Sequence, residues 1–266
     1  MNSQDSTALY ISPHLDDAVL SAGGLIARQI ANGMRVVVAT LVTADPVGLV
    51  LSPLAQRFQS AWGGGQRPFA DRCIEDANAV GALGAEWRHF GLLDCIYRQA
   101  PTGRFCYDTM GKLFSGLQDP EDTAFVTNVS DIVSSLIDEL RPKAIYTAAT
   151  VGRHVDHVCV LSAVRAVTKR NVTPLMLWED LPYATGLYPP DNPDTVTAAL
   201  ARLGLADAVP DLHEIDMSRK LAALRHYKSQ IKELYGSVET MDRAMTDFAL
   251  GLGKTGPCER FWKVHS

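Results

Sequence analysis

Short apolar runs alternate along the chain with longer stretches in which apolar residues recur at helical spacing. The short runs predict strands over 8–12, 35–43, 86–90, 144–147, 175–178 and 212–215. The longer stretches predict helices over 17–31, 68–83, 123–140, 156–169, 218–235 and 238–250. Alternation of this kind is typical of a mainly parallel sheet with helices on both faces. We therefore expect an α/β fold, a Rossmann-like three-layer sandwich.

Three long segments between these elements lack a sustained period. Residues 44–66 contain two prolines and a run of three glycines, with one short helix expected around 52–61. Residues 91–121 carry scattered glycines, and 182–210 begin with a proline-rich stretch. Long loops often carry binding residues, so we expect these loops to lie at the carboxyl ends of the strands and to determine the substrate.

The first motif with chemical content is Ser12-Pro13-His14-Leu15-Asp16-Asp17, directly after the first predicted strand. The i, i+3 spacing lets His14 and Asp17 face one point where the helix begins, and an imidazole with a carboxylate suits zinc. Asp16 points elsewhere. We predict that Asp17 coordinates the metal and that Asp16 accepts a proton from the attacking water.

A second motif, Gly152-Arg153-His154-Val155-Asp156-His157, follows another predicted strand. His157 offers a third ligand on the opening turn of its helix and completes a set with His14 and Asp17, which leaves one coordination position open. Capping is the alternative interpretation of Asp16 and Asp17, because acids are favoured at helix N-termini. Two such turns favour a catalytic site with one Zn²⁺ per chain.

The two motifs resemble those of the PIG-L family of zinc-dependent N-deacetylases, which act on N-acetylglucosamine-type sugars. They look most similar to bacterial members that deacetylate antibiotic precursors such as glycopeptide pseudoaglycones. Weaker motifs between them, Arg72-x-x-Glu75-Asp76, Leu83-Gly84 and Gly91-Leu92-Leu93-Asp94, occur in the family's usual order. The resemblance covers most of the chain.

Carried over residue by residue, the resemblance implies the same zinc ligands and the same base. It implies in addition that His154 is the electrostatic or general-acid partner and that Asp156 orients a histidine from behind. Leu15 departs from the proline often found in the first motif, without affecting a ligand. Residues 148–153 lack the tyrosine that some members use for the oxyanion, so this role would fall to zinc and His154.

Four further residues are candidates for substrate binding. By resemblance, Arg72 and Asp94 would lie near the sugar or the released acetate, although Arg72 also fits a solvated helix face. Arg153 at the rim would contact an anionic substrate group, or would be an ordinary solvated turn residue. Trp178, at the end of a strand with Glu179-Asp180-Leu181-Pro182-Tyr183, would form a wall for a sugar or belong to the core.

Composition narrows the remaining possibilities. With 266 residues, of which 47% are hydrophobic, the chain can form one domain over 1–266. A net charge of −5, spread along the chain, makes nucleic acid an unfavourable partner. Five scattered cysteines without a C-x-x-C pair predict buried thiols. The absence of a leader pattern or a spanning apolar run predicts a cytoplasmic protein with no integral membrane association.

We therefore expect a metal-dependent amide hydrolase that removes an N-acetyl or N-acyl group from an amino sugar or an amino-sugar-bearing metabolite. A catalytically silent sugar- or metabolite-binding protein on the same fold is one alternative, and an amidase acting on a thiol-cofactor conjugate is another. A nucleotide or methyl-donor enzyme lacks its G-x-G-x-x-G motif here, and a nucleophilic hydrolase lacks its G-x-S-x-G elbow. The sequence does not indicate an oligomeric state.

Overall fold

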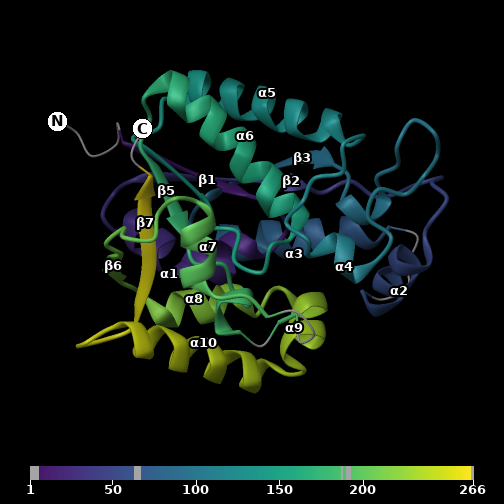
Figure 1. Ribbon diagram of the computed structural model, residues 1–266. Helices are drawn as coiled ribbons and strands as arrows, with labels where there is room; N and C mark the ends of the chain where they lie inside the picture. Colours follow the sequence, from purple (N-terminus) through teal and green to yellow (C-terminus); the bar gives the residue numbers. More distant parts are fainter. Residues whose placement is uncertain (1–5, 63–66, 187, 190–192, 265–266) are drawn as a thin grey trace.

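The computed structural model describes residues 6–62, 67–186, 188–189 and 193–264 (Figure 1). Its seven-stranded sheet has the order β3-β2-β1-β4-β5-β7-β6. The strands are β1 (Thr7–Ser12), β2 (Arg35–Val42), β3 (Glu86–Leu92), β4 (Ala144–Ala148), β5 (Leu175–Trp178), β6 (Asp211–Glu214) and β7 (Cys258–Val264). β1 to β5 are parallel, whereas β7 runs antiparallel to both of its neighbours. The predicted mainly parallel α/β sheet is confirmed.

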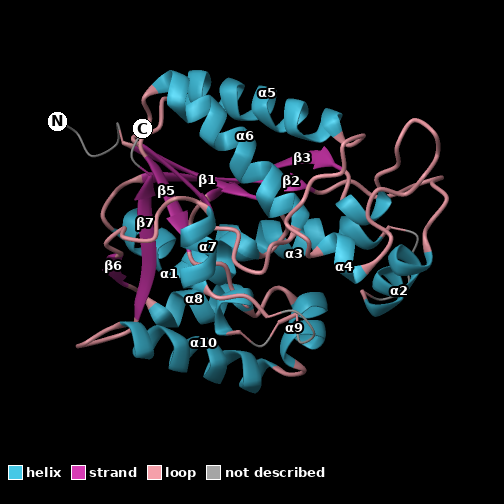
Figure 2. Cartoon of the chain, in the orientation of Figure 1, coloured by secondary structure: helices cyan, strands magenta, loops and turns pink. Residues whose placement is uncertain are grey.

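Helices cover both faces of this sheet (Figures 1 and 2). One face carries α5 (Thr123–Leu140) and α6 (Val155–Asn171), and the other carries α1 (Asp17–Ala31), α3 (Pro68–Leu83), α8 (Met217–Leu224) and α10 (Val238–Leu252). The smaller helices are α2 (Pro53–Ala61), α4 (Met110–Leu113), α7 (Val196–Arg202) and α9 (Lys228–Tyr235). The three-layer arrangement expected from the sequence is therefore present.

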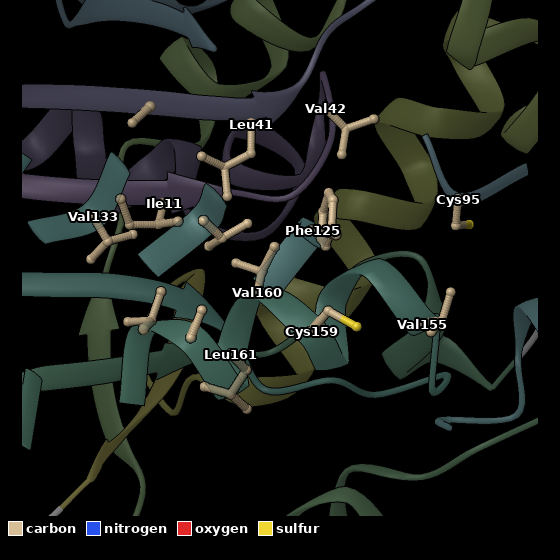
Figure 3. Close-up of a cluster of buried hydrophobic side chains, with 14 of the residues drawn as sticks. Ile11, Leu41, Val42, Cys95, Phe125, Val133, Val155, Cys159, Val160 and Leu161 are labelled. Carbon is tan, nitrogen blue, oxygen red and sulfur yellow. The ribbon is translucent and has the colours of Figure 1, made fainter. Parts of the chain in front are cut away.

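The core follows the two-residue period of the strands. In β1, Leu9 and Ile11 pack toward α5 and α6, whereas Ala8 and Tyr10 pack toward α1. Figure 3 shows Ile11 among side chains of the α5 and α6 layer, including Val133 and Val160. Both faces of the central strands are buried, which explains their continuous apolar sequence.

One predicted element was wrong, and two helices and one strand of the structure were not predicted. The helix expected over 218–235 is two helices, α8 and α9, separated by a turn. The strand β7 and the short helices α4 and α7 were not predicted, and α4 lies in the segment 91–121 that was expected to be irregular. Four of the cysteines are buried, whereas Cys73 is only half-buried; all five are free thiols. Within the described part of the chain, each helix is too short or too polar to cross a bilayer.

The topology determines where a site can form. β1 lies between β2 and β4, so the chain leaves β1 in one direction and returns to its other side only at β4. In open α/β sheets ligands bind beyond the carboxyl ends of the strands at such a reversal. The segments that follow β1 and β4 are the two motifs singled out in the sequence.

Candidate metal centre and active site

Three side chains from the two motifs meet beyond the ends of β1 and β4. His14 Nδ1, Asp17 Oδ2 and His157 Nε2 form a triangle in which each pair of atoms is 3.2 Å apart. A tetrahedral zinc ion with ligands at ~2.1 Å separates them by roughly 3.4 Å. The donor set and its spacing therefore fit a zinc ion, with a fourth position left for a water or substrate.

Two carboxylates behind the histidines determine which nitrogens face the triangle. His14 Nε2 lies 3.1 Å from Asp156 Oδ2, and His157 Nδ1 lies 2.9 Å from Asp180 Oδ1. Each of these nitrogens can donate a proton to its carboxylate, and in the neutral ring the other nitrogen then presents its lone pair to the triangle. Asp156 therefore lies where it can orient His14.

The charge around the triangle favours a cation. Burial opposes protonation of His157, but Asp17 and then Asp180 outweigh it and raise the pKa of His157 to about 9. The pKa of His14 is likewise raised, since the hydrogen bonds to Asp156 and Asp17 outweigh the effect of burial. Burial would raise the pKa of Asp17, but His157 and His14 hold it well below its usual range. The protein thus stabilises positive charge where the three ligand atoms converge.

A second set of possible ligands shares two of these residues. Ring nitrogens of His14, His154 and His157 lie within 4.8 Å of one another. We favour Asp17 over His154 as the third ligand because Asp17 Oδ2 is 3.2 Å from both other ligand atoms. His154 Nδ1 is also already engaged, since it accepts a hydrogen bond from the backbone N–H of Asp156 at 3.2 Å.

Asp16 occupies a strained position at the start of α1. Its φ of 128° is rare for a residue with a side chain, and its carboxylate makes no capping hydrogen bond. The capping alternative therefore does not describe Asp16. Burial, followed by repulsion from Asp17, raises the pKa of Asp16 to about 8, while Arg72 opposes this shift. A carboxylate of this kind is suited to accept a proton near neutral pH.

His154 presents a neutral donor to the same space. Because its Nδ1 accepts the hydrogen bond from the backbone of Asp156, the neutral ring carries its proton on Nε2. Burial and then the positive charge of His14 lower the pKa of His154 well below its usual value. The neutral form can still donate a hydrogen bond to a developing oxyanion.

A cavity opens from these residues toward the surface, and the space between its walls, mouth included, is about 680 Å³. Polar groups at its base include Asp16, Asp17, Asp94 and His154. Apolar and aromatic side chains from the three long loops and α9 form the walls: Phe58, Trp62, Ile96, Leu113, Phe114, Leu181, Pro182, Tyr183, Tyr188 and Leu234. The loops expected to determine the substrate therefore supply most of the apolar wall, whereas the polar lining comes mainly from other segments.

The four candidate substrate-binding residues divide into two pairs. Arg72 and Asp94 line the cavity. Arg72 is buried, with its guanidinium 4.6 Å above the ring of Trp62, so the solvated-face interpretation does not hold. Arg153 does not line the cavity and packs against Gly116. Trp178 is fully buried in the core beside Tyr10, in the cluster that packs against α1. It therefore belongs to the core, which was the alternative interpretation.

Two residues that contact His157 were named from the sequence only as members of the segment after Trp178 and were given no role of their own. Asp180 follows β5 and pairs with His157, and Tyr183 packs edge-on against the same histidine with ring centroids 5.6 Å apart. Both lie in the segment after Trp178 that was expected to form a wall. Leu181, Pro182 and Tyr183 of this segment line the cavity, whereas Trp178 does not.

Comparison with known proteins agrees with this site. The family model for PIG-L, GlcNAc-PI de-N-acetylase, matches residues 9–168, which include both motifs. The chain belongs to the PIG-L family. The matched region holds His14, Asp17 and His157 together with Asp16, so the resemblance inferred from the two motifs is confirmed.

Solved structures of deacetylases of teicoplanin and of the A40926 pseudoaglycone are similar over nearly the whole chain. The zinc-inhibited form of teicoplanin deacetylase has a TM-score of 0.80 and 30% identity, covering 98% of this chain and 99% of that one. The A40926 pseudoaglycone deacetylase has a TM-score of 0.75 and 28% identity, covering 98% of each chain. The expected similarity to antibiotic-biosynthesis members of the family is confirmed.

A curated relative comes from aminoglycoside chemistry. The 2'-N-acetylparomamine deacetylase of Streptomyces fradiae is 32% identical over 179 residues, which are 66% of this chain and 57% of that protein. The match therefore spans somewhat more than half the length of this relative. Both proteins are named as deacetylases, one of 2'-N-acetylparomamine and the other of teicoplanin.

Proposed function

We propose that this protein is a zinc-dependent N-deacetylase that removes an acetyl group from an amino sugar or an amino-sugar-bearing metabolite of bacterial secondary metabolism. The observation that carries the proposal is the triangle of His14, Asp17 and His157 ligand atoms with Asp16 beside it at the base of an open cavity. Relatives that are named as deacetylases of antibiotic intermediates support the substrate class.

We assign the ligands of one Zn²⁺ to His14, Asp17 and His157. When bound, the ion would supply Lewis acidity for the amide carbonyl and for water. Asp16 would take a proton from the water that attacks the carbonyl carbon. His154 would donate its Nε2–H to the carbonyl oxygen as negative charge develops there. Return of the proton from Asp16 to the leaving nitrogen would break the C–N bond and release acetate and the free amine.

The walls of the cavity support a sugar or an aromatic scaffold as the carrier of the acetamide. Phe114, Tyr183 and Tyr188 lie within 6.0 Å of one another by ring centroids, on the side of His154. Phe58 in α2 and Trp62 directly after it contribute a second aromatic pair, with ring centroids 5.5 Å apart. Ring faces of this kind stack on sugars and on aromatic groups. We assign Arg72 and Asp94, at the base, to contacts with the sugar or the acetate.

The test measures metal and turnover together. Zinc content is determined on purified protein, and acetate release is followed with a panel of N-acetylated amino sugars, aminoglycoside precursors and glycopeptides. We expect about one zinc per chain and, for Asp16→Asn, a loss of activity of ~10²–10⁴-fold with zinc retained. Asp108→Asn, at a surface carboxylate paired with Lys112, is the matched control and keeps full activity.

Two outcomes would contradict the proposal. Protein that binds no zinc and hydrolyses no panel member would reject the metal centre and the activity together. Zinc binding without turnover of any acetylated sugar would favour the silent binding protein, and turnover of a thiol-cofactor conjugate alone would favour the amidase alternative.

A further inference from the structure

A buried ionic chain extends behind the metal centre, away from the cavity. Its central member is Arg98, which follows the 3-10 turn Cys95–Tyr97 and is only 9% exposed. The guanidinium contacts two carboxylates, with Nη2 2.6 Å from Asp156 Oδ1 and Nε donating to Asp122 Oδ2 at 3.0 Å. Arg98 does not line the cavity, so it has no direct contact with a substrate there.

The surroundings of Arg98 leave it little freedom. Its Nη1 donates to the carbonyl of Leu93 at 3.0 Å, and its charge lies 3.9 Å above the ring of Phe125. Asp122 is held in turn by the hydroxyl of Tyr107 at 2.9 Å. A planar guanidinium with partners on several sides is fixed in orientation as well as in position.

The two oxygens of Asp156 divide their contacts. Oδ2 lies 3.1 Å from His14 Nε2 and accepts the backbone N–H of Cys95 at 3.1 Å, whereas Oδ1 faces Arg98. The contact between Arg98 and Oδ1 is a close ion pair and not an aligned hydrogen bond. A turn of the carboxylate about its own bond would break the contacts of both oxygens at once.

We propose that Arg98 is a positioning residue for the metal centre. By holding the carboxylate of Asp156 in one plane, Arg98 fixes the ring of His14 so that Nδ1 points at the triangle of ligand atoms. Arg98 thereby increases zinc affinity without touching the metal or the substrate. This inference rests on the proposed function, because it takes the triangle as the zinc site.

A purely structural role is the competing explanation. Arg98 also connects the segment before α4 to Asp122 at the start of α5, and its loss would leave buried carboxylates without a partner. Such a role would lower stability without acting through Asp156. The two explanations therefore differ in whether the effect of Arg98 depends on Asp156.

The experiment is a double-mutant cycle on zinc affinity, measured by competition with a chromophoric chelator. We expect R98M to weaken zinc binding about 10–100-fold and R98K to lie between R98M and wild type. D156N should weaken binding to a similar extent. The double variant R98M/D156N should bind zinc like D156N alone, because Arg98 acts through Asp156.

Further measurements distinguish a positioning role of Arg98 from a purely structural one. Cobalt(II) loaded into R98M should show shifted visible absorption bands, which report on the ligand geometry. R104M removes another arginine with two carboxylate partners, Asp119 and Glu121, at the surface and should leave zinc affinity unchanged. If R98M fails to fold, D122N and R98K remove part of the support and should each weaken zinc binding severalfold.

Zinc affinity of folded R98M within twofold of wild type would overturn the inference. Independent effects of R98M and D156N, which multiply in the double variant, would also overturn it and favour the structural role. If wild type itself binds no zinc, the proposed function fails first. If wild type binds zinc and R98M binds equally well, only the role of Arg98 fails.

Discussion

At the scale of single residues, the side chains behind His157 are as informative as this proposed ligand itself. Asp180 accepts a hydrogen bond from His157 Nδ1 through Oδ1 and from the backbone N–H of Val151 through Oδ2 at 3.0 Å. It is 1% exposed. One carboxylate thus connects the end of β5 to the turn that follows β4.

Asp180→Asn keeps the shape of this side chain and removes its charge. We expect zinc affinity to fall ~10–100-fold, because a neutral asparagine polarises His157 less than a carboxylate does and fixes its ring less firmly. Competition titration measures the change. Asp211→Asn on the exposed strand β6 is the control, and equal affinities of the two variants would contradict a role for Asp180.

Gly152 in the second motif is required for a steric reason. It has a φ of +84°, and a Cβ there would lie 2.5 Å from the ring of Tyr183. Gly152→Ala should destabilise the fold by about 1–3 kcal/mol and displace Tyr183, with roughly tenfold loss of turnover. Gly186 also has a positive φ, of +72°, but a Cβ there would meet no atom within 4 Å. Gly186→Ala should therefore lower stability without affecting turnover. Thermal unfolding and acetate release measure both effects.

The residues of the site differ in how far sequence predicts them. His14, Asp16 and Asp17 occur together after one strand, so local spacing is enough to predict that they act together. Asp180 and Arg98 occur singly in loops, where Asp and Arg usually have solvated roles. Their partners lie on α6, in the turn after β4 and at the start of α5, and these pairings exist only after folding.

At the scale of elements, close packing of α1 depends on one glycine. A Cβ at Gly24 would lie 2.6 Å from the side chain of Ile215, which leaves no room for a methyl group. Gly24→Ala should therefore destabilise the protein by about 1–3 kcal/mol. Gly81→Ala in α3 meets no atom within 4 Å and should stabilise it by up to about 1 kcal/mol. Chemical denaturation tests both, and equal shifts would contradict the packing argument.

The elements that sequence missed depend on contacts between distant segments. The break between α8 and α9 places Tyr227 in the core, where its hydroxyl donates to Asp76 Oδ1 at 2.6 Å. The helical periodicity of 218–235 does not reveal that the chain must turn at this point to bury Tyr227. β7 follows a glycine-rich turn and forms by antiparallel pairing with β5 and β6, which are far from it in sequence. The βα units near the N-terminus were predicted because each is local.

At the scale of the whole molecule, Asp76 joins both halves of the chain. It accepts hydrogen bonds from Thr40 on β2, from Tyr227 after α8 and from His89 on β3, the last at 2.8 Å. Burial would lower the pKa of His89, but the hydrogen bond to Asp76 outweighs it and raises the pKa to about 9. The folded protein therefore favours the protonated imidazole.

This contact predicts a pH dependence of stability. Because the folded pKa of His89 is above its ordinary value of 6.5, the stabilisation is complete below pH 6.5 and is lost as pH rises through about 9. Urea unfolding of wild type and His89→Gln should differ most at pH 6 and least at pH 10. His226→Gln, at an exposed histidine, controls for loss of an imidazole. A difference that grows with pH would contradict the assignment.

The pairing of β1 with β4 has a consequence for how the protein acquires its activity. His14 and His157 are separated by 143 positions in the chain, and they come together only when these two central strands lie side by side. A ribosome must complete most of the chain before the ligand set exists. Zinc uptake would therefore be a late event that marks assembly of the sheet, and incompletely folded chains would not retain the ion.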